Sequence, residues 1–223
     1  MNNEAHIVWD WNGTLLNDVS IALEATNRAL RHFKLGELSL EDYRALYCVP
    51  VHDFYSSILG REILDAELDA IGVIFNDYYR DAIHLAPLAH DAREVIASRT
   101  SQSICSLLKH PVLAGMIRRF EIDAYFCYVH GRDLPLTRNG KLDHLVAHID
   151  LLKETHGVEA GAIVVIGDSI DDALAARAAG VHAVLYSSGT HSHERLSQVG
   201  VPVAHSLMQA ATFADAIALN QSL

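Results

Sequence analysis

The stretch His6-Ile7-Val8-Trp9-Asp10-Trp11-Asn12-Gly13-Thr14-Leu15 decides the fold of this 223-residue chain. Its apolar beginning predicts a buried strand, which ends at Asp10 and is followed at once by a Gly-Thr turn. In open α/β sheets, ligands bind at the carboxyl ends of the strands. Asp10 is therefore a candidate for chemistry, although an ordinary strand followed by an Asx-type turn would explain the same residues when taken alone.

Short apolar runs recur along the chain and alternate with helical patterns. The runs that predict strands are Ile7–Asp10, Ser103–Leu107, Ala124–Val129, Ala162–Gly167 and Val181–Tyr186. The helical patterns are Ala89–Arg99, Pro111–Phe120, Lys141–His156, Asp171–Ala179 and Leu207–Leu219. This alternation predicts an α/β fold with a parallel sheet and helices on both of its faces.

Residues 17–85 interrupt the alternation. No convincing strand is visible there, and apolar residues recur at helical spacing, as in Leu64 and Leu68. We predict a small all-helical cap domain over 17–85, inserted into a core domain that consists of 1–16 and 86–223.

The composition and charge of the chain make nucleic acid a poor candidate as a partner. Half of the residues are hydrophobic, and the net charge is -11 with histidine neutral. The four lysines, Lys34, Lys109, Lys141 and Lys153, are scattered, so no basic stripe favours nucleic acid. An acidic protein that binds an anion needs a metal ion or a cluster of amide donors to overcome its own field.

We expect a cytoplasmic protein without a membrane segment. The first predicted strand begins within a few residues of the amino terminus, which leaves no room for a signal peptide. No apolar run approaches the ~20 residues of a membrane span. Cys48, Cys105 and Cys127 form no CxxC pair, so we interpret them as small buried hydrophobic residues in a reducing compartment.

Four polar groups follow predicted strands or lie in loops on the same side of the sheet. They are Asp10-x-Asn12-Gly13-Thr14, Ser106, Lys141 and Gly167-Asp168-Ser169-Ile170-Asp171-Asp172. Each has an ordinary explanation as a turn residue, a surface lysine or an acidic helix start, but their occurrence in one ordered set favours a shared site. In this order they resemble the four motifs of the haloacid dehalogenase superfamily of phosphatases. The resemblance is closest to its phosphoglycolate-phosphatase-type branch, which has a helical cap inserted after the first motif.

The resemblance covers essentially the whole chain and implies a Rossmann-like α/β core that hydrolyses small phosphate monoesters. Asp10 would be the nucleophile and form an aspartyl-phosphate, with Asn12 and Lys141 as the other catalytic residues. The implied cofactor is Mg²⁺, held by Asp10, the backbone carbonyl of Asn12, Asp168 and Asp172. The phosphate group would contact Asn12, Gly13, Thr14, Ser106 and Lys141.

Asn12 departs from the family pattern, because these phosphatases usually carry an aspartate there as general acid and base. A carboxamide cannot shuttle a proton, and the loss of a general acid–base group typically lowers the rate by ~10²–10⁴-fold. Three explanations stay open. The substrate has a good leaving group; His52, His110 or His130 supplies the proton; or the asparagine marks reduced turnover, a stable phospho-enzyme or an altered sequence.

The cap predicts a small phosphorylated metabolite as the partner, with neither nucleic acid nor membrane, for a monomer or homodimer. The turn Tyr47–Tyr55 is our prediction for the edge of the cap that faces the substrate. Two rival functions stay open: phosphoryl transfer to an acceptor other than water, and a catalytically impaired homologue that only binds a phosphorylated ligand.

Overall fold

The computed structural model describes residues 4–133 and 140–220 and contains a six-stranded sheet. The strands are β1 (His6–Trp9), β2 (Gln102–Lys109), β3 (Val129–Arg132), β4 (Ile163–Gly167), β5 (His182–Tyr186) and β6 (Val203–Ala204). Every neighbouring pair is parallel, in the order β3-β2-β1-β4-β5-β6. The direction of winding therefore reverses between β1 and β4, which is the place where open α/β sheets bind ligands.

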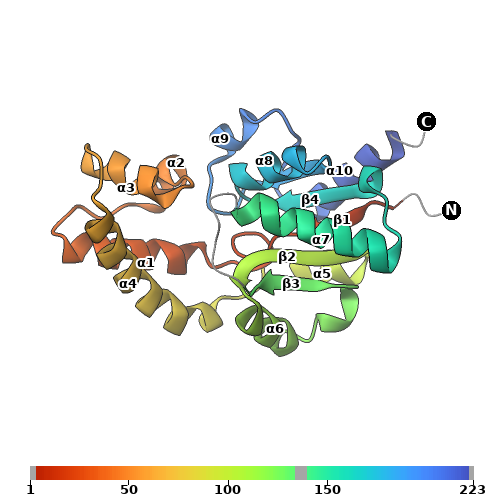
Figure 1. Ribbon diagram of the computed structural model, residues 1–223, viewed down its shortest axis with the longest axis horizontal. Coiled ribbons are helices and arrows are strands. Elements are labelled where there is room, and N and C mark those ends of the chain that lie inside the picture. The colour runs from red at the N-terminus through yellow and green to blue at the C-terminus, as the bar shows by residue number, and fades with distance from the viewer. Residues whose placement is uncertain (1–3, 134–139, 221–223) are drawn as a thin grey trace.

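Helices cover both faces of the sheet, as the sequence predicts (Figure 1). One face packs against α5 (Ala92–Ala97), α6 (His110–Arg119) and α10 (Leu207–Asn220). The other face packs against α7 (Gly140–His156), α8 (Ile170–Ala178) and α9 (His193–Ser197). Side chains of β1 alternate between these two cores, with Ile7 and Trp9 in the first and Val8 in the second, because successive strand residues point to opposite faces.

The segment predicted to be helical forms four α-helices: α1 (Val19–His32), α2 (Leu40–Leu46), α3 (Val51–Leu59) and α4 (Asp65–Ala82). The short 3₁₀ helix η1 (Ile83–Leu85) follows them. These helices have a hydrophobic cluster of their own, which includes Leu30, Tyr43, Phe54 and Ile71. Figure 1 shows them gathered on the left, beside the end of the sheet to which the strand arrows point. We refer to this group of helices as the cap.

Several boundaries differ from the prediction. The apolar run Ala124–Val129 is not a strand: it holds most of the 3₁₀ helix η2 (Asp123–Tyr125), and β3 begins only at Val129. Cys127 is exposed rather than buried, because it precedes β3 outside the core. The prediction missed β6, which has two residues, and α9, which has five. A further 3₁₀ helix, η3 (Ala160–Ala162), precedes β4. Within the described ranges, no helix is both long and apolar enough to cross a membrane.

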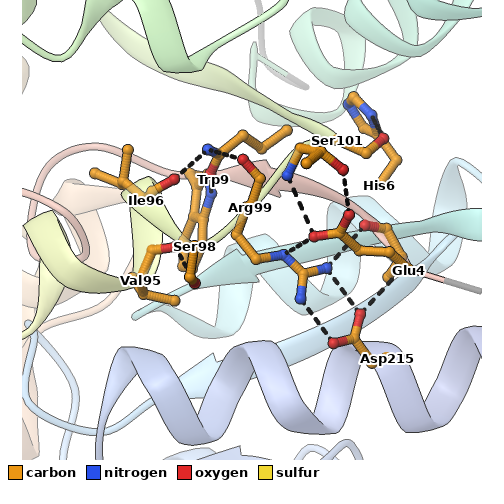
Figure 2. A network of polar contacts seen from close by, with 12 residues as sticks. Glu4, His6, Trp9, Val95, Ile96, Ser98, Arg99, Ser101 and Asp215 are labelled. Atoms are coloured by element: carbon orange, nitrogen blue, oxygen red, sulfur yellow. Dashed lines mark hydrogen bonds and ion pairs between the residues drawn. The ribbon is translucent and has the colours of Figure 1, made fainter. Parts of the chain in front are cut away.

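Arg99 ties the first strand to the last helix (Figure 2). Its guanidinium donates to both carboxylate oxygens of Asp215 in α10 at 2.7 Å and to the carbonyl of Ala5 at 3.1 Å. Its Nε lies 2.8 Å from Glu4 Oε1. The Arg99 side chain is only 7% exposed, whereas those of Glu4 and Asp215 are 17% and 33% exposed, so both ion pairs are partly shielded from water.

We predict that Arg99→Met lowers the free energy of unfolding by about 2 kcal/mol. The change leaves the carboxylates of Glu4 and Asp215 without their ion-pair partner. Loss of one partner from a buried pair costs about 3–5 kcal/mol, and the partial exposure of Asp215 reduces this cost. Urea unfolding measures the effect. Arg80→Met, which removes exposed ion pairs with Asp77 and Asp81, is the control and should leave the midpoint almost unchanged. Equal effects of the two substitutions would contradict the prediction.

Candidate active site

Asp10, Lys141 and Asp172 meet at the carboxyl ends of the central strands, although they come from separate elements. Asp10 follows β1 directly, and its N–H still donates to the carbonyl of Ile166 in β4 at 2.9 Å. Lys141, in the first turn of α7, places its Nζ 2.5 Å from Asp10 Oδ1 and 2.8 Å from Asp172 Oδ1. The second contact is an ion pair without hydrogen-bond geometry. The prediction that these residues share a site agrees with this arrangement.

The amino terminus of α8 fixes the orientation of Asp172. Its Oδ2 accepts from the Ser169 N–H at 3.1 Å and from Ser169 Oγ at 2.6 Å, while Ser169 Oγ accepts from the Asp172 N–H at 3.4 Å. This reciprocal arrangement is a capping box. The helix therefore uses Oδ2 and leaves Oδ1 to face Lys141. Asp172 can thus cap α8 and pair with Lys141 at the same time.

Asp168, directly after β4, is held by two threonines and packed against two glycines. Thr190 donates to Asp168 Oδ2 from its N–H and from its hydroxyl, each at 2.6 Å, and Thr14 Oγ1 donates to Oδ1 at 3.2 Å. A Cβ atom at Gly13 or Gly189 would come within 2.4 or 2.2 Å of the Asp168 side chain. Larger residues would displace the carboxylate, which explains why glycine is required at these two positions.

The buried carboxylates repel one another. Burial raises the pKa of Asp10 to about 8, and the charges of Asp172 and Asp168 add to the rise against the attraction of Lys141. Burial, followed by the charge of Asp172, raises the pKa of Asp168 to about 6. Burial opposes the charged form of Lys141, but Asp10 and Asp172 outweigh it and hold the pKa of Lys141 well above its usual value. Lys141 thus pairs with Asp10 and Asp172 within a set of three buried carboxylates.

The residues present fit a divalent cation. One oxygen each from Asp10, Asp168 and Asp172 lies within 4.8 Å of the others, and all three side chains are buried. Carboxylate oxygens are hard ligands of the kind that Mg²⁺ prefers, and a dication would offset the excess negative charge. The backbone carbonyl of Asn12 as an additional ligand stays a prediction.

Asn12 is part of a hydrogen-bonded group that the sequence analysis did not find. Its Nδ2 donates to Asp18 Oδ2 at 2.9 Å and to the Tyr79 hydroxyl at 2.8 Å, and the same hydroxyl donates to Asp18 Oδ2. Asp18 is 3% exposed. Burial raises its pKa, while the hydrogen bonds from Tyr79, Asn12 and Gly13 oppose the rise. Because Tyr79 belongs to α4, this group joins the loop that follows β1 to the cap.

Two predicted phosphate contacts do not agree with the structure. The Gly13 N–H donates to Asp18 Oδ1 at 2.7 Å and to the Leu16 carbonyl at 3.0 Å, so it is not free to bind a phosphoryl oxygen. The Thr14 hydroxyl is fully buried and donates to Asp168. We correct both assignments: Gly13 makes room for Asp168, and Thr14 orients it.

Ser106 lies near the end of β2, which pairs directly with β1. Its Oγ accepts the Leu108 N–H at 3.2 Å, which leaves the hydroxyl hydrogen to donate to a ligand. A phosphate-binding role for Ser106 thus stays a prediction.

The three histidines predicted as possible proton donors have other contacts, and their role as donors stays a prediction. His52 is on α3 and pairs with Asp53, and His110 Nδ1 accepts the Gly131 N–H at 3.3 Å. Neither ring is among the described residues that line the cavity beside Asn12. His130 packs against His144 beneath α7, on the face of the sheet opposite to the one that α6 covers.

A cavity of about 1200 Å³ lies between the cap and the core. Asn12 and Asp18 lie at its wall, together with Thr190 and with Leu107 and Leu108 at the end of β2. The remaining lining is largely apolar and aromatic, and includes Tyr47, Val51, Phe54 and Tyr55 from the turn predicted to face the substrate. That turn therefore does border the cavity.

The cap also contacts the loop that holds Asp168. Arg44, in α2, donates to the carbonyls of Gly189 at 2.8 Å and Ser188 at 2.6 Å. The ring of Tyr47 packs edge-on against His191, with centroids 5.7 Å apart. The sequence offered no signal for these contacts, because Ser188 to His191 form an irregular loop far from every motif.

Comparisons with known proteins agree with this architecture. Residues 7–186 match the family model of haloacid dehalogenase-like hydrolases. No curated protein matches the sequence.

Solved structures resemble this one at low sequence identity. A haloacid dehalogenase-like hydrolase from Streptococcus pneumoniae is 19% identical, with a TM-score of 0.76 over 96% of this chain and 99% of that one. A predicted phosphoglycolate phosphatase from Haemophilus somnus is 19% identical, with a TM-score of 0.66 over 99% and 100%. Protein Tyrosine Kinase A from Mycobacterium tuberculosis is 19% identical, with a TM-score of 0.73 over 93% and 98%. These likenesses concern the fold, whereas the family model spans most of the sequence. The chain therefore belongs to the haloacid dehalogenase-like hydrolase family.

Proposed function

We propose that this protein is a Mg²⁺-dependent phosphatase that hydrolyses a small phosphate monoester through an aspartyl-phosphate on Asp10. The observation that carries the proposal is the meeting of three buried carboxylates with Lys141 at the carboxyl ends of β1 and β4. This arrangement suits phosphoryl transfer, in which catalysis consists mainly of positioning and charge neutralisation.

Each residue has a defined part in the proposed reaction. A carboxylate oxygen of Asp10 attacks phosphorus, the ester P–O bond breaks, and the leaving oxygen takes up a proton. Water then attacks the same phosphorus, which releases phosphate and restores the Asp10 carboxylate. Lys141 holds Asp10 in place and offers a positive charge to the phosphoryl oxygens, and Ser106 donates a hydrogen bond to one of them. Asp10, Asp168 and Asp172 would hold Mg²⁺, which when bound would supply further charge neutralisation.

Asn12 determines which substrates suit this site. Its amide hydrogens are donated to Asp18 and Tyr79, which leaves its carboxamide oxygen as the group available to a ligand. Neither atom transfers a proton. We therefore propose a substrate whose leaving group departs readily, with the proton taken from solvent.

The cavity supports a small phosphorylated metabolite as the partner, acting in the cytoplasm. Its apolar and aromatic lining suits a leaving group with an apolar surface, and the cap excludes large molecules. We propose no nucleic acid or membrane as a partner.

Phosphoryl transfer to an acceptor other than water is the second candidate. Asn12 cannot activate water as a base, and one structural neighbour is described as a tyrosine kinase. Measuring inorganic phosphate against phosphorylated acceptor in the presence of alcohols or phenols separates the two candidates.

We predict that Asp10→Asn lowers the turnover of p-nitrophenyl phosphate by about 10³-fold or more, because the nucleophile is lost. Asp53→Asn removes an exposed carboxylate of the cap and serves as the matched control, with unchanged turnover expected. Circular dichroism verifies that both variants are folded. Turnover retained by a folded Asp10→Asn protein would exclude the covalent route.

We predict that Asn12→Asp raises the hydrolysis of alkyl phosphates by roughly 10²-fold, while p-nitrophenyl phosphate changes much less. The new carboxyl group would lie beside Asp18, and the repulsion between the two acids would keep one of them protonated and able to act as an acid. Steady-state rates for the two substrates, with Asn12→Ala as the control, measure the difference. An unchanged or lower alkyl phosphate rate would show that proton donation does not limit this enzyme.

We predict that Mg²⁺ stabilises the protein above about pH 6 and not below it. The pKa values of Asp10 and Asp168 are raised in the folded state, so the protonated forms of both groups stabilise the metal-free fold below their ordinary pKa. This stability is lost as the pH rises through about 6 for Asp168 and about 8 for Asp10. The same deprotonation creates the ligands for the cation. At 100 times its Kd, Mg²⁺ should raise Tm by about 5–10 °C.

Thermal melts at about pH 8 and about pH 5, with and without Mg²⁺, measure this effect. Asp168→Asn should abolish the shift, and Asp53→Asn should preserve it. A shift of the same size at both pH values, or one that survives in Asp168→Asn, would place the cation elsewhere.

A further inference from the structure

Cys105 and His130 project toward the same side of the sheet. They are direct partners in the parallel pairing of β2 with β3, so their side chains share a face. This face is covered by α7, which brings His144 to the same place. One ligand atom each from Cys105, His130 and His144 lies within 4.8 Å of the others. The group consists of one sulfur and two nitrogen donors from three elements, and it is separate from the carboxylate set.

The two imidazoles are neutral and at least partly oriented. His144 Nε2 donates to the carbonyl of His130 at 3.2 Å, which leaves Nδ1 as the nitrogen with the free electron pair. Metal-binding histidines commonly donate their other N–H to a backbone carbonyl in this way. His130 Nδ1 is buried and has no hydrogen-bond partner among the described residues. The two rings lie 4.0 Å apart, measured between centroids.

The surroundings keep these histidines uncharged. Burial, followed by the neighbouring His144, lowers the pKa of His130 to about 4. Burial also lowers the pKa of His144, against the carbonyls of His130 and Ser106. His148, one turn further along α7, is fully buried, accepts or donates a hydrogen bond at Ser103 Oγ and stacks on His130. Neutral imidazoles at physiological pH have the electron pairs that a metal needs.

We propose that Cys105, His130 and His144 bind a borderline-soft transition metal ion such as Zn²⁺, at a site distinct from the Mg²⁺ site. Thiolate and imidazole are the ligands that such ions prefer, and three protein ligands with a fourth position open form a recognised zinc arrangement. On binding, the S–H bond of Cys105 breaks, its proton passes to solvent and the sulfur electron pair forms the bond to the metal.

Cobalt titration tests the proposal without any need for activity. The untagged protein is stripped with a chelator, saturated with Mg²⁺ to fill the carboxylate site, and titrated with Co²⁺ while the absorption spectrum is recorded. We expect a thiolate-to-cobalt charge-transfer band that saturates at about one Co²⁺ per chain and is bleached by Zn²⁺.

The chain offers matched controls for this titration. Cys105→Ser should abolish the band, whereas Cys127→Ser, which removes an exposed thiol, should preserve it. His144→Gln should weaken Co²⁺ binding by about 10-fold or more. Asp168→Asn should keep the band, because the carboxylate site is not involved. Circular dichroism verifies the fold of each variant.

Two results would overturn the proposal. One is the absence of a charge-transfer band in the folded wild-type protein at an excess of Co²⁺. The other is a band that persists in Cys105→Ser and disappears in Cys127→Ser, which would assign the ion to the exposed thiol.

Discussion

The excess of buried negative charge at the carboxyl ends of β1 and β4 is the constraint on which the rest of the site depends. Asp10, Asp168 and Asp172 are each at most 8% exposed, and Lys141 forms ion pairs with two of them, Asp10 and Asp172. Like charges at this separation destabilise one another in a medium from which water is excluded. The fold tolerates them because separate elements fix each carboxylate: the β1–β4 ladder, the Thr190 loop and the α8 capping box. The proposed divalent cation would offset this excess of negative charge.

The cap is joined to the core by polar contacts as well as by apolar packing, in which Ile21, Tyr79 and Ile83 lie against the hydrophobic cluster of the core. Tyr79 in α4 bonds to Asn12 and Asp18, and Arg44 in α2 bonds to the loop that fixes Asp168. The first contact therefore ends on the loop that carries Asp10, and the second ends on the loop whose Thr190 holds Asp168. Any movement of the cap must break them, so the position of the cap and the geometry of the catalytic loops are coupled. This contact is uncharged at the Asn12 side chain, whose amide donates to Asp18 where a carboxylate would repel it.

The sequence predicted the parts of the molecule that follow periodic or positional rules. Apolar runs that end in polar residues located Asp10, Ser106 and Asp168, because parallel strands bring their carboxyl ends to one edge. Helical periodicity located the cap. Isolated loop residues were not predicted, since Asp18 and Thr190 belong to no periodic pattern and reach the site only through tertiary contacts. The failure at Gly13 has a similar cause: spacing indicates that an N–H lies near the site, but not that Asp18 already accepts from it.

The two proposed metal sites differ in the chemistry of their donor atoms. Three carboxylates would form a hard site, whereas Cys105, His130 and His144 would form a softer one. The softer set adjoins residues of the proposed active site along the chain, because Cys105 precedes Ser106 and His144 lies one turn beyond Lys141 on α7. An ion that drew β2 and α7 together would act on the backbone that carries both Ser106 and Lys141. Strands and helices that position one site would then respond to occupation of the other, through rigid elements that the two sites share.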